Sequence, residues 1–453
     1  MRIDRSRLPE PGPSSPASFP AIEKSALANG LNVWTVRHAQ IPVVAFSLLI
    51  RRGASSDPAG KHGLAAMTAD MLDEGSGDRS AIEIHEDIAR LGTQLETDIG
   101  SDAAVAGFTV LGRFASRALS LLADVVVRPS LKDEDVARVR QLRLHRLTQL
   151  RDVPSAIADR TFLSLLYGEH PYGHSPIGTE QALASMTVDD VRAFHERAIR
   201  PSVATLIAVG DCDHDTIRRL ADDAFGAWHG TAIDGSVNDP ELPRSPRLSV
   251  VPRPGAPQSE LRIGHVSAPR STPDYHALVT GNMVLGGQFS SRINLNLRED
   301  KGFTYGARTS FEFRRRAGPF VLQVGVQTSA TAQSITESMD EISAMVSNRP
   351  ITAEELRLAA AALTRGYARN FETADQIARA ATQLALYDLP DTYFAEFVPR
   401  IEQLTTGEVT RALARHLHAS RLTTVVVGDY DVVGAELGQL GLGDPVVLPP
   451  ETF

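Results

Sequence analysis

The sequence contains a single cysteine, Cys212, and no apolar run close to the ~18 residues that a membrane-spanning helix needs. One cysteine excludes an internal disulfide framework and any zinc or iron–sulfur site built from several cysteines. The longest clean apolar run, Val43 to Ile50, is interrupted only by a serine, and its length suits a buried strand. We therefore expect no membrane span.

Basic residues are fewer than acidic ones, with 46 Lys and Arg against 55 Asp and Glu and a net charge of −9. A general nucleic-acid binder is expected to carry a basic stripe that gathers phosphates, so this balance argues against nucleic acid as a partner. The 42% hydrophobic content allows a large buried core, and 453 residues suit two or more domains rather than one.

The first residues, MRIDRSRLPEPGPSSPASFP, include basic side chains but no apolar stretch of the kind found in secretory signals. Five prolines predict an extended, mobile arm over residues 1–22. This gives a cytoplasmic expectation, or a periplasmic one if an export signal has been trimmed from the N-terminus.

Two ordered pairs of segments indicate an internal duplication. Residues 203–211 (VATLIAVGD) and 422–429 (LTTVVVGD) are each an apolar strand ending in Gly-Asp, and each follows a helix-like stretch that begins after a threonine. Residues 104–111 and 320–326 are strand-like, and each precedes a helix, an Arg-Pro turn and an acidic-capped helix. The order repeats, so chance similarity is a poor explanation.

The duplication predicts an α+β fold made of two homologous domains, each a sheet covered by helices. The segment 229–247 is rich in Gly, Pro, Asp and Ser, lacks periodicity and is interpreted as a linker. The predicted domains are therefore 23–228 and 248–441, followed by a tail at 442–453.

Several motifs that would assign a chemistry are missing from the sequence. It contains no G-x-x-x-x-G-K-[ST] phosphate loop, no HExxH helix and no G-x-S-x-G nucleophile elbow. His170 and His174 stand four apart, but Pro171 and Gly173 lie between them, so the helical ligand geometry fails and turn histidines are the simpler interpretation.

Three segments together resemble the pitrilysin/insulinase-like zinc metallopeptidases, the inverzincins, over about residues 23–441. They are NGLNVWTVRHAQIPVVAFSLLIRRGASSDPAGKHGLAAMTADMLDEGS, GEHPYGHSPIGTEQALASMTVDDVRAFHERAIRPSVATLIAVGD and VLGGQFSSRINLNLREDKGFTYGARTSF. The resemblance implies that the two domains form half of a clamshell. Two such halves, on one chain or two, enclose a chamber for unfolded peptides.

In active members of this family, a helix near the N-terminus carries H-x-x-E-H, and a glutamate on a later helix completes the zinc site. Positions i, i+3 and i+4 share one helix face, so two imidazoles grip the metal while the glutamate reaches its water as general base.

This sequence departs from the family pattern at that helix, GLAAMTADMLDEG. Counted from the Met-Leu that follows, the two histidine positions hold Ala66 and Asp70, and the glutamate position holds Ala69. The later glutamate position, counted back from Pro154, holds His145. Alanine offers neither a ligand nor a proton acceptor. We therefore expect no hydrolytic centre and no metal site on this chain, and no cofactor of its own.

One alternative keeps a metal near this position. If the fold holds, Asp70 and His145 face each other, with Asp73 and Glu74 just beyond, and could hold a cation other than a catalytic zinc. The simpler interpretation is a hydrogen-bonded Asp–His pair that fills the vacated site, because a catalytic zinc needs three protein ligands and an open position.

The second half retains Arg298 and, seven positions on, Tyr305 in NLREDKGFTYG. The resemblance implies that such a pair contacts the substrate next to the bond cut at the zinc of the opposite half. A phenol can donate to an oxyanion and a guanidinium can hold a peptide carbonyl. The structural alternative is a surface salt-bridge arginine and a strand tyrosine. The run 314–316 (RRR) predicts a solvated hairpin.

The leading hypothesis is a non-catalytic subunit of a heterodimeric zinc peptidase that contacts substrate through Arg298 and Tyr305. Its partner would be a homologous subunit that carries H-x-x-E-H, the zinc and the general base; a homodimer is the alternative if no such partner exists. The second hypothesis is an inert scaffold or peptide-binding homologue of the same fold. The third is an independent hydrolase with an unrecognised metal at Asp70 and His145.

Overall fold

The computed structural model describes residues 18–232, 235–241 and 247–449 and contains two six-stranded mixed sheets. The first sheet runs in the order β1 (Ile22–Ala26), β2 (Asn32–Arg37), β8 (Ala204–Gly210), β3 (Val43–Ile50), β7 (Ala104–Leu111), β6 (Glu96–Ile99). The second runs β14 (Val446–Val447), β9 (Leu248–Pro252), β13 (Thr423–Gly428), β10 (Gln258–Val266), β12 (Pro319–Gln327), β11 (Ala307–Phe311). A small hairpin joins β4 (Gly75–Ser76) to β5 (Arg79–Ser80).

The two sheets share one topology, which confirms the predicted duplication. In the first sheet β8 pairs in parallel with β2, and in the second sheet its counterpart β13 pairs in parallel with β9. In each, the next strand is antiparallel to both neighbours, as β3 is between β8 and β7 and β10 is between β13 and β12. The α+β prediction of two homologous domains is therefore correct.

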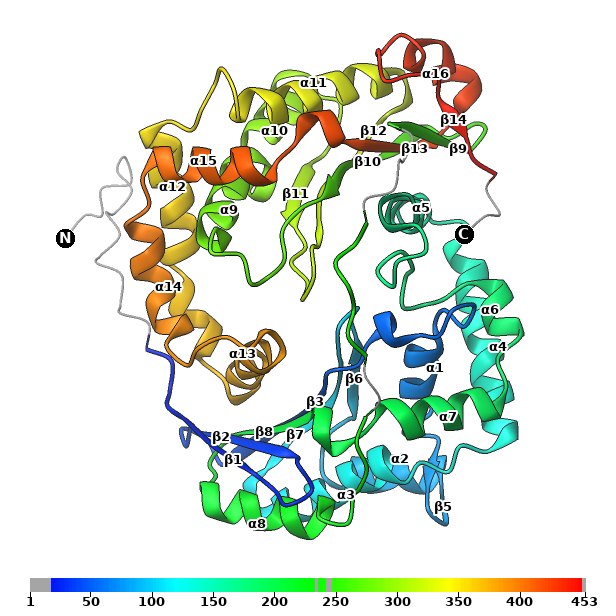
Figure 1. Ribbon diagram of the computed structural model, residues 1–453, viewed down its shortest axis with the longest axis vertical. Coiled ribbons are helices and arrows are strands. Elements are labelled where there is room, and N and C mark those ends of the chain that lie inside the picture. Colours follow the sequence, from blue (N-terminus) through cyan, green and yellow to red (C-terminus); the bar gives the residue numbers. More distant parts are fainter. Residues whose placement is uncertain (1–17, 233–234, 242–246, 450–453) are drawn as a thin grey trace, which may run out of the picture.

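The central strands form because their residues are β-branched or apolar on both faces. Every residue of β8 and of β13 is buried, so neither strand shows the alternation of a half-exposed sheet. A sheet that is buried on both faces needs helices packed on both faces, and Figure 1 shows this arrangement in each half.

The helices of the first half are α1 to α8. Their bounds are Leu64–Asp70, Ala81–Arg90, Ala115–Val127, Asp133–Leu150, Pro154–Tyr167, Glu180–Ala184, Val188–Ala198 and His214–Phe225. Those of the second half are α9 to α16, at Tyr275–Asn282, Arg292–Asn294, Thr331–Met345, Ala353–Thr364, Ala374–Tyr387, Tyr393–Glu402, Thr406–His416 and Tyr430–Leu437.

Threonines start the helices that precede the Gly-Asp strands, as predicted. Thr187 and Thr405 are the N-caps of α7 and α15, and each exchanges hydrogen bonds with an acidic residue three positions on. Such a capping box typically contributes ~1 kcal/mol, so these starts are specified locally.

Each half of the chain contributes one helix that packs on the sheet of the other half, and we call α5 and α13 the exchanged helices. Helix α5 of the first half packs on β10 and β13 of the second sheet, and α13 of the second half packs on β3 and β8 of the first. Figure 1 shows both helices between the sheets, with α3 and α8 on the far side of one sheet and α11 on the far side of the other. The exchanged faces are apolar and buried, so each sheet depends on the other half for part of its core.

The hairpin after β11 packs against the first half through Arg314, which is buried, while Arg315 and Arg316 are exposed. The predicted solvated hairpin at 314–316 is therefore wrong for Arg314 and correct for the other two arginines. The Arg314 guanidinium lies over the rings of Tyr172 and Tyr167, at 4.8 and 5.5 Å from the ring centres. The Tyr172 hydroxyl donates to Asp102 at 2.5 Å, and the backbone N–H of Arg315 donates to the same carboxylate at 2.8 Å. Arg314 is held because the aromatic faces of the first half receive its guanidinium, and the Asp102 carboxylate fixes the hairpin backbone at Arg315.

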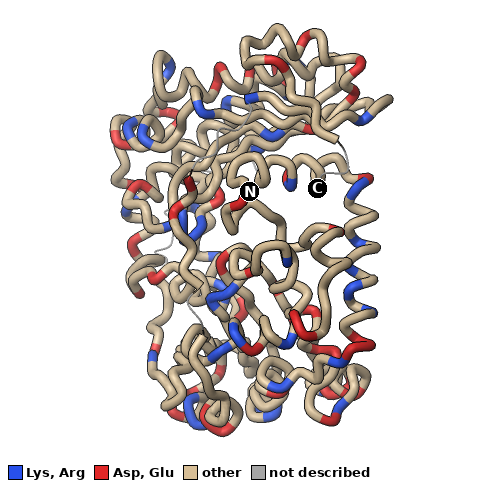
Figure 2. Tube along the Cα trace, turned by 45° about the vertical axis from the view of Figure 1, so that its right-hand side comes forward, with Lys and Arg blue, Asp and Glu red and all other residues tan. Residues whose placement is uncertain are grey.

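Most of the predicted N-terminal arm lies outside the described residues, as do parts of the linker. The described linker segments, 229–232, 235–241 and 247, contain no helix or strand. Strand β14 adds to the second sheet from within the predicted tail. Basic and acidic residues alternate over both halves (Figure 2). Within the described ranges, no helix is long and apolar enough to cross a membrane.

Candidate functional site

Helix α1, which carries three of the predicted degenerate metal positions, is held firmly in place. The Asp57 carboxylate, whose side chain is fully buried, accepts from the backbone N–H of Gly63 at 2.6 Å and of Ala65 at 2.7 Å. Asp57 also lies 3.1 Å from Nε2 of His174. A carboxylate at the N-terminus of a helix complements its unpaired N–H groups, so α1 is anchored whether or not it binds a metal.

His174 is a residue whose role the sequence interpretation missed. It lies in a turn, as predicted, but its side chain is only 8% exposed, and its ring stacks on His62 with centres 4.1 Å apart. Burial, and then the proximity of His174, lowers the pKa of His62 below its ordinary value. The signal in the sequence was the pair of histidine loops, GKHG and YGHSP, which the fold brings together on either side of Asp57.

Ala66 and Ala69 are buried at the positions where ligand and base are expected. Beside Ala69 lies a cavity of about 20 Å³, lined mainly by apolar groups including Ala65, Ile99 and Phe194. That volume is about the size of one water molecule, and its walls offer few polar partners. Within residues 18–232, 235–241 and 247–449, no group of three or more His, Cys, Asp or Glu side chains is placed to hold a metal.

Asp70 pairs with Arg143 rather than with His145. Arg143 on α4 donates to Asp70 at 2.6 Å and to the carbonyls of Pro176 and Ile177 at 2.9 and 3.1 Å. The side chain of His145 is exposed, and no hydrogen bond or ion pair joins it to Asp70 in the described part of the chain.

The expected Asp70–His145 pair is therefore wrong, and the helical period explains why. The buried residues of α4 recur at Val136, Val139, Arg143 and Leu147, so position 145 lies on another face. The assignment of Ala66, Ala69, Asp70 and His145 as the family's degenerate metal positions stays a prediction.

Arg298 lies on the π-helical segment Leu295–Asp300 and is largely covered. Its side chain is 11% exposed, forms an ion pair with Glu299 at 2.6 Å and stacks 3.1 Å from the centre of the Phe289 ring. Phe289 is itself 73% exposed, so it covers the guanidinium from the solvent side. The Arg298 guanidinium would become available to a ligand if the ligand replaced Glu299 as its partner or if Phe289 moved away.

Tyr305 stands on an ordered turn with its side chain free. It is 94% exposed, more than any other large hydrophobic side chain in the described residues. Its neighbour Thr304 donates to the carbonyl of Gly325 at 2.7 Å, and the Ala307 N–H donates to Asn294 at 2.9 Å. These hydrogen bonds fix the backbone on both sides of Tyr305, so the turn holds the phenol pointing outward. No hydrogen bond joins Arg298 to Tyr305 within the described ranges.

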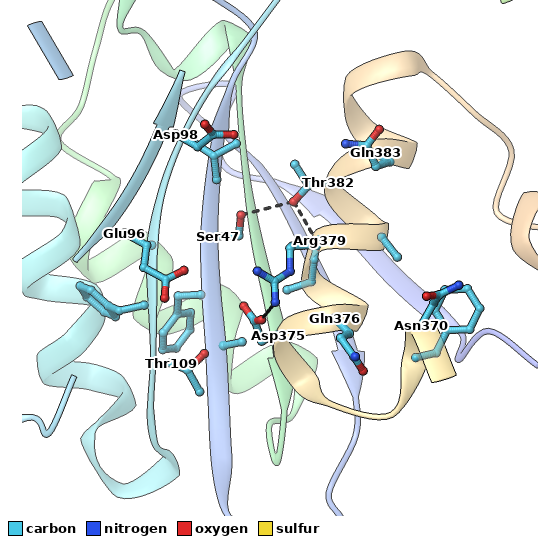
Figure 3. A pocket seen from close by; sticks show the side chains of 18 of the residues that line it. Ser47, Glu96, Asp98, Thr109, Asn370, Asp375, Gln376, Arg379, Thr382 and Gln383 are labelled. Carbon is cyan, nitrogen blue, oxygen red and sulfur yellow. Dashed lines mark hydrogen bonds and ion pairs between the residues drawn. The ribbon is translucent and has the colours of Figure 1, made fainter. Parts of the chain in front are cut away.

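A cavity of about 660 Å³ lies where the exchanged helix α13 meets the first sheet. Its walls are β3, β6, β7, α13 and the short helix Tyr367–Phe371 (Figure 3). The sequence interpretation did not find it, because its walls come from two distant segments, 45–109 and 367–394, which the packing of α13 on the first sheet brings together. No local pattern announces such a contact.

The duplicated two-sheet fold thus contains an anchored helix α1 with buried alanines at the positions predicted for a metal ligand and a general base. Two sequence families match, "Insulinase (Peptidase family M16)" over residues 32–180 and "Peptidase M16 inactive domain" over residues 185–363. The chain belongs to the insulinase family of peptidases, M16.

Relatives and solved structures agree with that assignment. An uncharacterized zinc protease of Mycobacterium tuberculosis is 27% identical over 432 residues, which cover 93% of this chain and 97% of that protein. The crystal structure of a peptidase M16 inactive domain from Pseudomonas fluorescens is 26% identical with a TM-score of 0.84, covering 90% and 98% of the two chains. A protease from Helicobacter pylori, at 19% identity and a TM-score of 0.82, shares the fold.

Proposed function

We propose that this chain is the non-catalytic, substrate-contacting subunit of a heterodimeric zinc metallopeptidase that cleaves unfolded peptides. The observation that carries the proposal is α1: the helix is anchored by Asp57, yet Ala66 and Ala69 stand at the ligand and base positions. Methyl groups neither coordinate zinc nor accept a proton. The fold is thus maintained where the chemistry is lost.

The zinc and the general base would come from a partner that carries H-x-x-E-H. A homodimer does not supply them, because both copies have the same alanines. The exposed hydroxyl of Tyr305 is suited to donate to the oxyanion that forms during peptide hydrolysis at the partner's zinc. Arg298, once released from Glu299, is suited to hold a peptide carbonyl through its planar fork.

The alternative is a catalytically inert scaffold or peptide-binding homologue. One observation favours it: the Arg298 guanidinium is already engaged by Glu299 and covered by Phe289. In a scaffold, that arrangement would be a local packing feature without a role in turnover.

The test is peptide turnover by the purified two-chain complex. We expect Tyr305→Phe to lower kcat/KM about 100- to 1,000-fold, since removing one oxyanion donor costs about 2.7 to 4 kcal/mol. Arg298→Ala is expected to lower it by a similar factor. The matched control is Arg308→Ala, an exposed arginine of β11, which should leave turnover unchanged.

Complex formation must be measured on the same samples by gel filtration. Unchanged turnover in an intact complex of the Tyr305 and Arg298 variants would contradict substrate contact and favour the scaffold.

A further inference from the structure

A small cavity with basic walls lies beside the linker, on the second half of the chain. Four of the side chains that line it are basic: Arg415, His416, His418 and Arg421. They come from the end of α15 and from the segment that leads into β13, and residues 239–240 of the linker also line the cavity. Its volume, about 210 Å³, is roughly seven times the ~30 Å³ share of one water molecule but below the ~300 Å³ of a typical pocket for a drug-sized ligand. The cavity therefore suits a small ion or a compact head group.

The guanidinium of Arg421 is a positive charge without a partner among the described residues. The side chain is exposed, and it forms no hydrogen bond or ion pair with residues 18–232, 235–241 or 247–449. Its influence reaches the next basic residue, because burial, and then the charges of Arg421 and His416, lower the pKa of His418. The cavity wall thus holds a positive charge that raises the local electrostatic potential.

The ring of His418 is a second unused donor. The backbone N–H of His418 donates to Nε2 of His265 at 3.0 Å, which fixes the backbone at this position. Neither ring nitrogen of His418 has a hydrogen-bond partner in the part of the chain that the structure describes. A neutral imidazole carries one N–H donor, so this ring can donate to an anion without being protonated.

The other two basic residues share one carboxylate, that of Asp274. Arg415 donates to its two oxygens at 3.0 and 2.6 Å, and Nε2 of His416 lies 2.9 Å from one of them. The pair with Asp274 uses two of the five N–H groups of the Arg415 guanidinium, and this side chain is 55% exposed. Arg415 therefore keeps donors for a second acceptor.

Two features of the cavity disfavour an anion, and each is offset. Helix α15 ends at His416, and the carbonyls at the end of a helix carry partial negative charge. The hydroxyl of Ser267 donates to the carbonyl of His416 at 2.8 Å and so caps it. Asp239 adds a carboxylate, but it is 79% exposed and lies 3.7 Å from Arg316, so water and that arginine weaken its field. Arg421 has no such counter-charge among the described residues, so the wall keeps a positive balance.

We propose that this cavity binds a phosphate group, either the free ion or that of a small monoester. The Arg421 guanidinium and the His418 imidazole donate to its oxygens, and Arg415 adds an N–H that its carboxylate pair does not use. A phosphate in this position also lies against residues 239–240, so it ties the linker to the second half. The site uses no residue of α1 and neither Arg298 nor Tyr305, so it does not depend on the proposed peptidase role.

The test is calorimetric titration of the full-length chain with inorganic phosphate at pH 7.0, with the ionic strength held constant by chloride. We expect one phosphate per chain with a Kd below about 1 mM. Arg421→Met keeps the length of the side chain and removes every donor, and it should weaken binding at least tenfold. His418→Phe keeps a ring without an N–H and should weaken binding about fivefold.

Two further variants test whether the effect belongs to this cavity. Arg218→Met removes an exposed arginine of α8 in the first half and should leave the affinity for phosphate unchanged. Asp239→Asn removes the carboxylate of the cavity wall and releases Arg316, so it should tighten binding about threefold. Thermal unfolding verifies that every variant folds.

Glycerol 3-phosphate, titrated in parallel, distinguishes the two sources of the phosphate group. Tighter binding of inorganic phosphate assigns the free ion, and tighter binding of the ester assigns a monoester; in both cases Arg421→Met must weaken the tighter ligand. No heat beyond that of the chloride control, or equal losses for Arg421→Met and Arg218→Met, would overturn the proposal. Peptide turnover enters none of these titrations, so their outcome is independent of the proposed peptidase role.

Discussion

His265 is held in its neutral form by two hydrogen bonds of opposite direction. Its Nδ1 donates to the carbonyl of Val266 at 2.8 Å, and its Nε2 accepts from the N–H of His418 at 3.0 Å. Burial lowers the pKa of His265 to about 4. Protonation would both charge a buried ring and remove the acceptor for His418.

This histidine predicts acid-sensitive stability. In the unfolded chain the pKa of this imidazole is about 6.5. Below that pH the unfolded state therefore binds a proton that the folded state does not bind. The contribution is full above pH 6.5 and is lost as pH falls toward 4, on the order of 3 kcal/mol in total. His276, whose pKa burial also lowers to about 4, acts in the same direction. Urea midpoints measured from pH 7.5 to 4.5 should fall accordingly.

Replacing His265 tests whether this side chain causes the pH dependence of stability. His265→Gln should flatten part of that pH dependence, whereas His229→Gln, at an exposed position, should leave it unchanged. A wild-type profile that is flat between pH 6.5 and 4.5 would contradict this account.

The ion pair between Arg143 and Asp70 predicts that the purified chain contains little metal. Its guanidinium already neutralises Asp70, at 2.6 Å, so a cation at that carboxylate would have to displace a buried arginine. Elemental analysis of the purified chain should give zinc and other transition metals well below one equivalent, unchanged by Asp70→Asn. Stoichiometric metal that disappears in Asp70→Asn would instead support an independent hydrolase.

At the scale of elements, α5 is tied to the other half through Arg262. This arginine of β10 is 3% exposed and donates to Asp159 of α5 at 2.5 Å and to Glu260 at 2.6 Å. Its removal would leave two carboxylates close together without their cation.

We therefore expect Arg262→Ala to lower the free energy of unfolding by about 3 kcal/mol, read from urea denaturation. Arg357→Ala serves as the control, because its pair with Glu354 is exposed and one helical turn apart, and should cost under ~0.5 kcal/mol. Equal effects of the two substitutions would show that α5 is not held by this contact.

Local patterns predicted much of the fold, because they act within single elements. Periodicity and capping predict the strands at 104–111 and 204–210, the helix starts at Thr187 and Thr405, and the duplication. The exchange of α5 and α13 could not be predicted, since an amphipathic helix does not specify which sheet it covers. Arg314 was misplaced for the same reason: its aromatic partners are about 140 positions away.

The site was predictable at the level of residue types and less so at the level of contacts. Counting along the motif found Ala66, Ala69 and Asp70 on one short helix. It paired Asp70 with the wrong residue of α4, because a shift of two positions on a helix changes the face. The cavity between α13 and the first sheet was not found, because its two walls are far apart in the sequence.

At the scale of the whole molecule, the exchanged helices make each half depend on the other. Each half alone would expose the apolar sheet face that α13 or α5 covers. We expect one cooperative thermal transition, with calorimetric and van't Hoff enthalpies equal. A chain cut within 235–241 and coexpressed as two fragments should purify as a 1:1 complex. Two separate transitions, or fragments that are monomeric and folded alone, would contradict this interdependence.

The most direct measurement of the central claim is affinity capture of the full-length chain from its native lysate, followed by a peptide turnover assay on what is captured. The account predicts a stoichiometric second protein of the same family carrying H-x-x-E-H, with peptide cleavage by the complex that neither chain shows alone. A chain that is captured alone or only with further copies of itself, with no cleavage gained, would contradict the two-chain peptidase and leave the scaffold or peptide-binding function in its place.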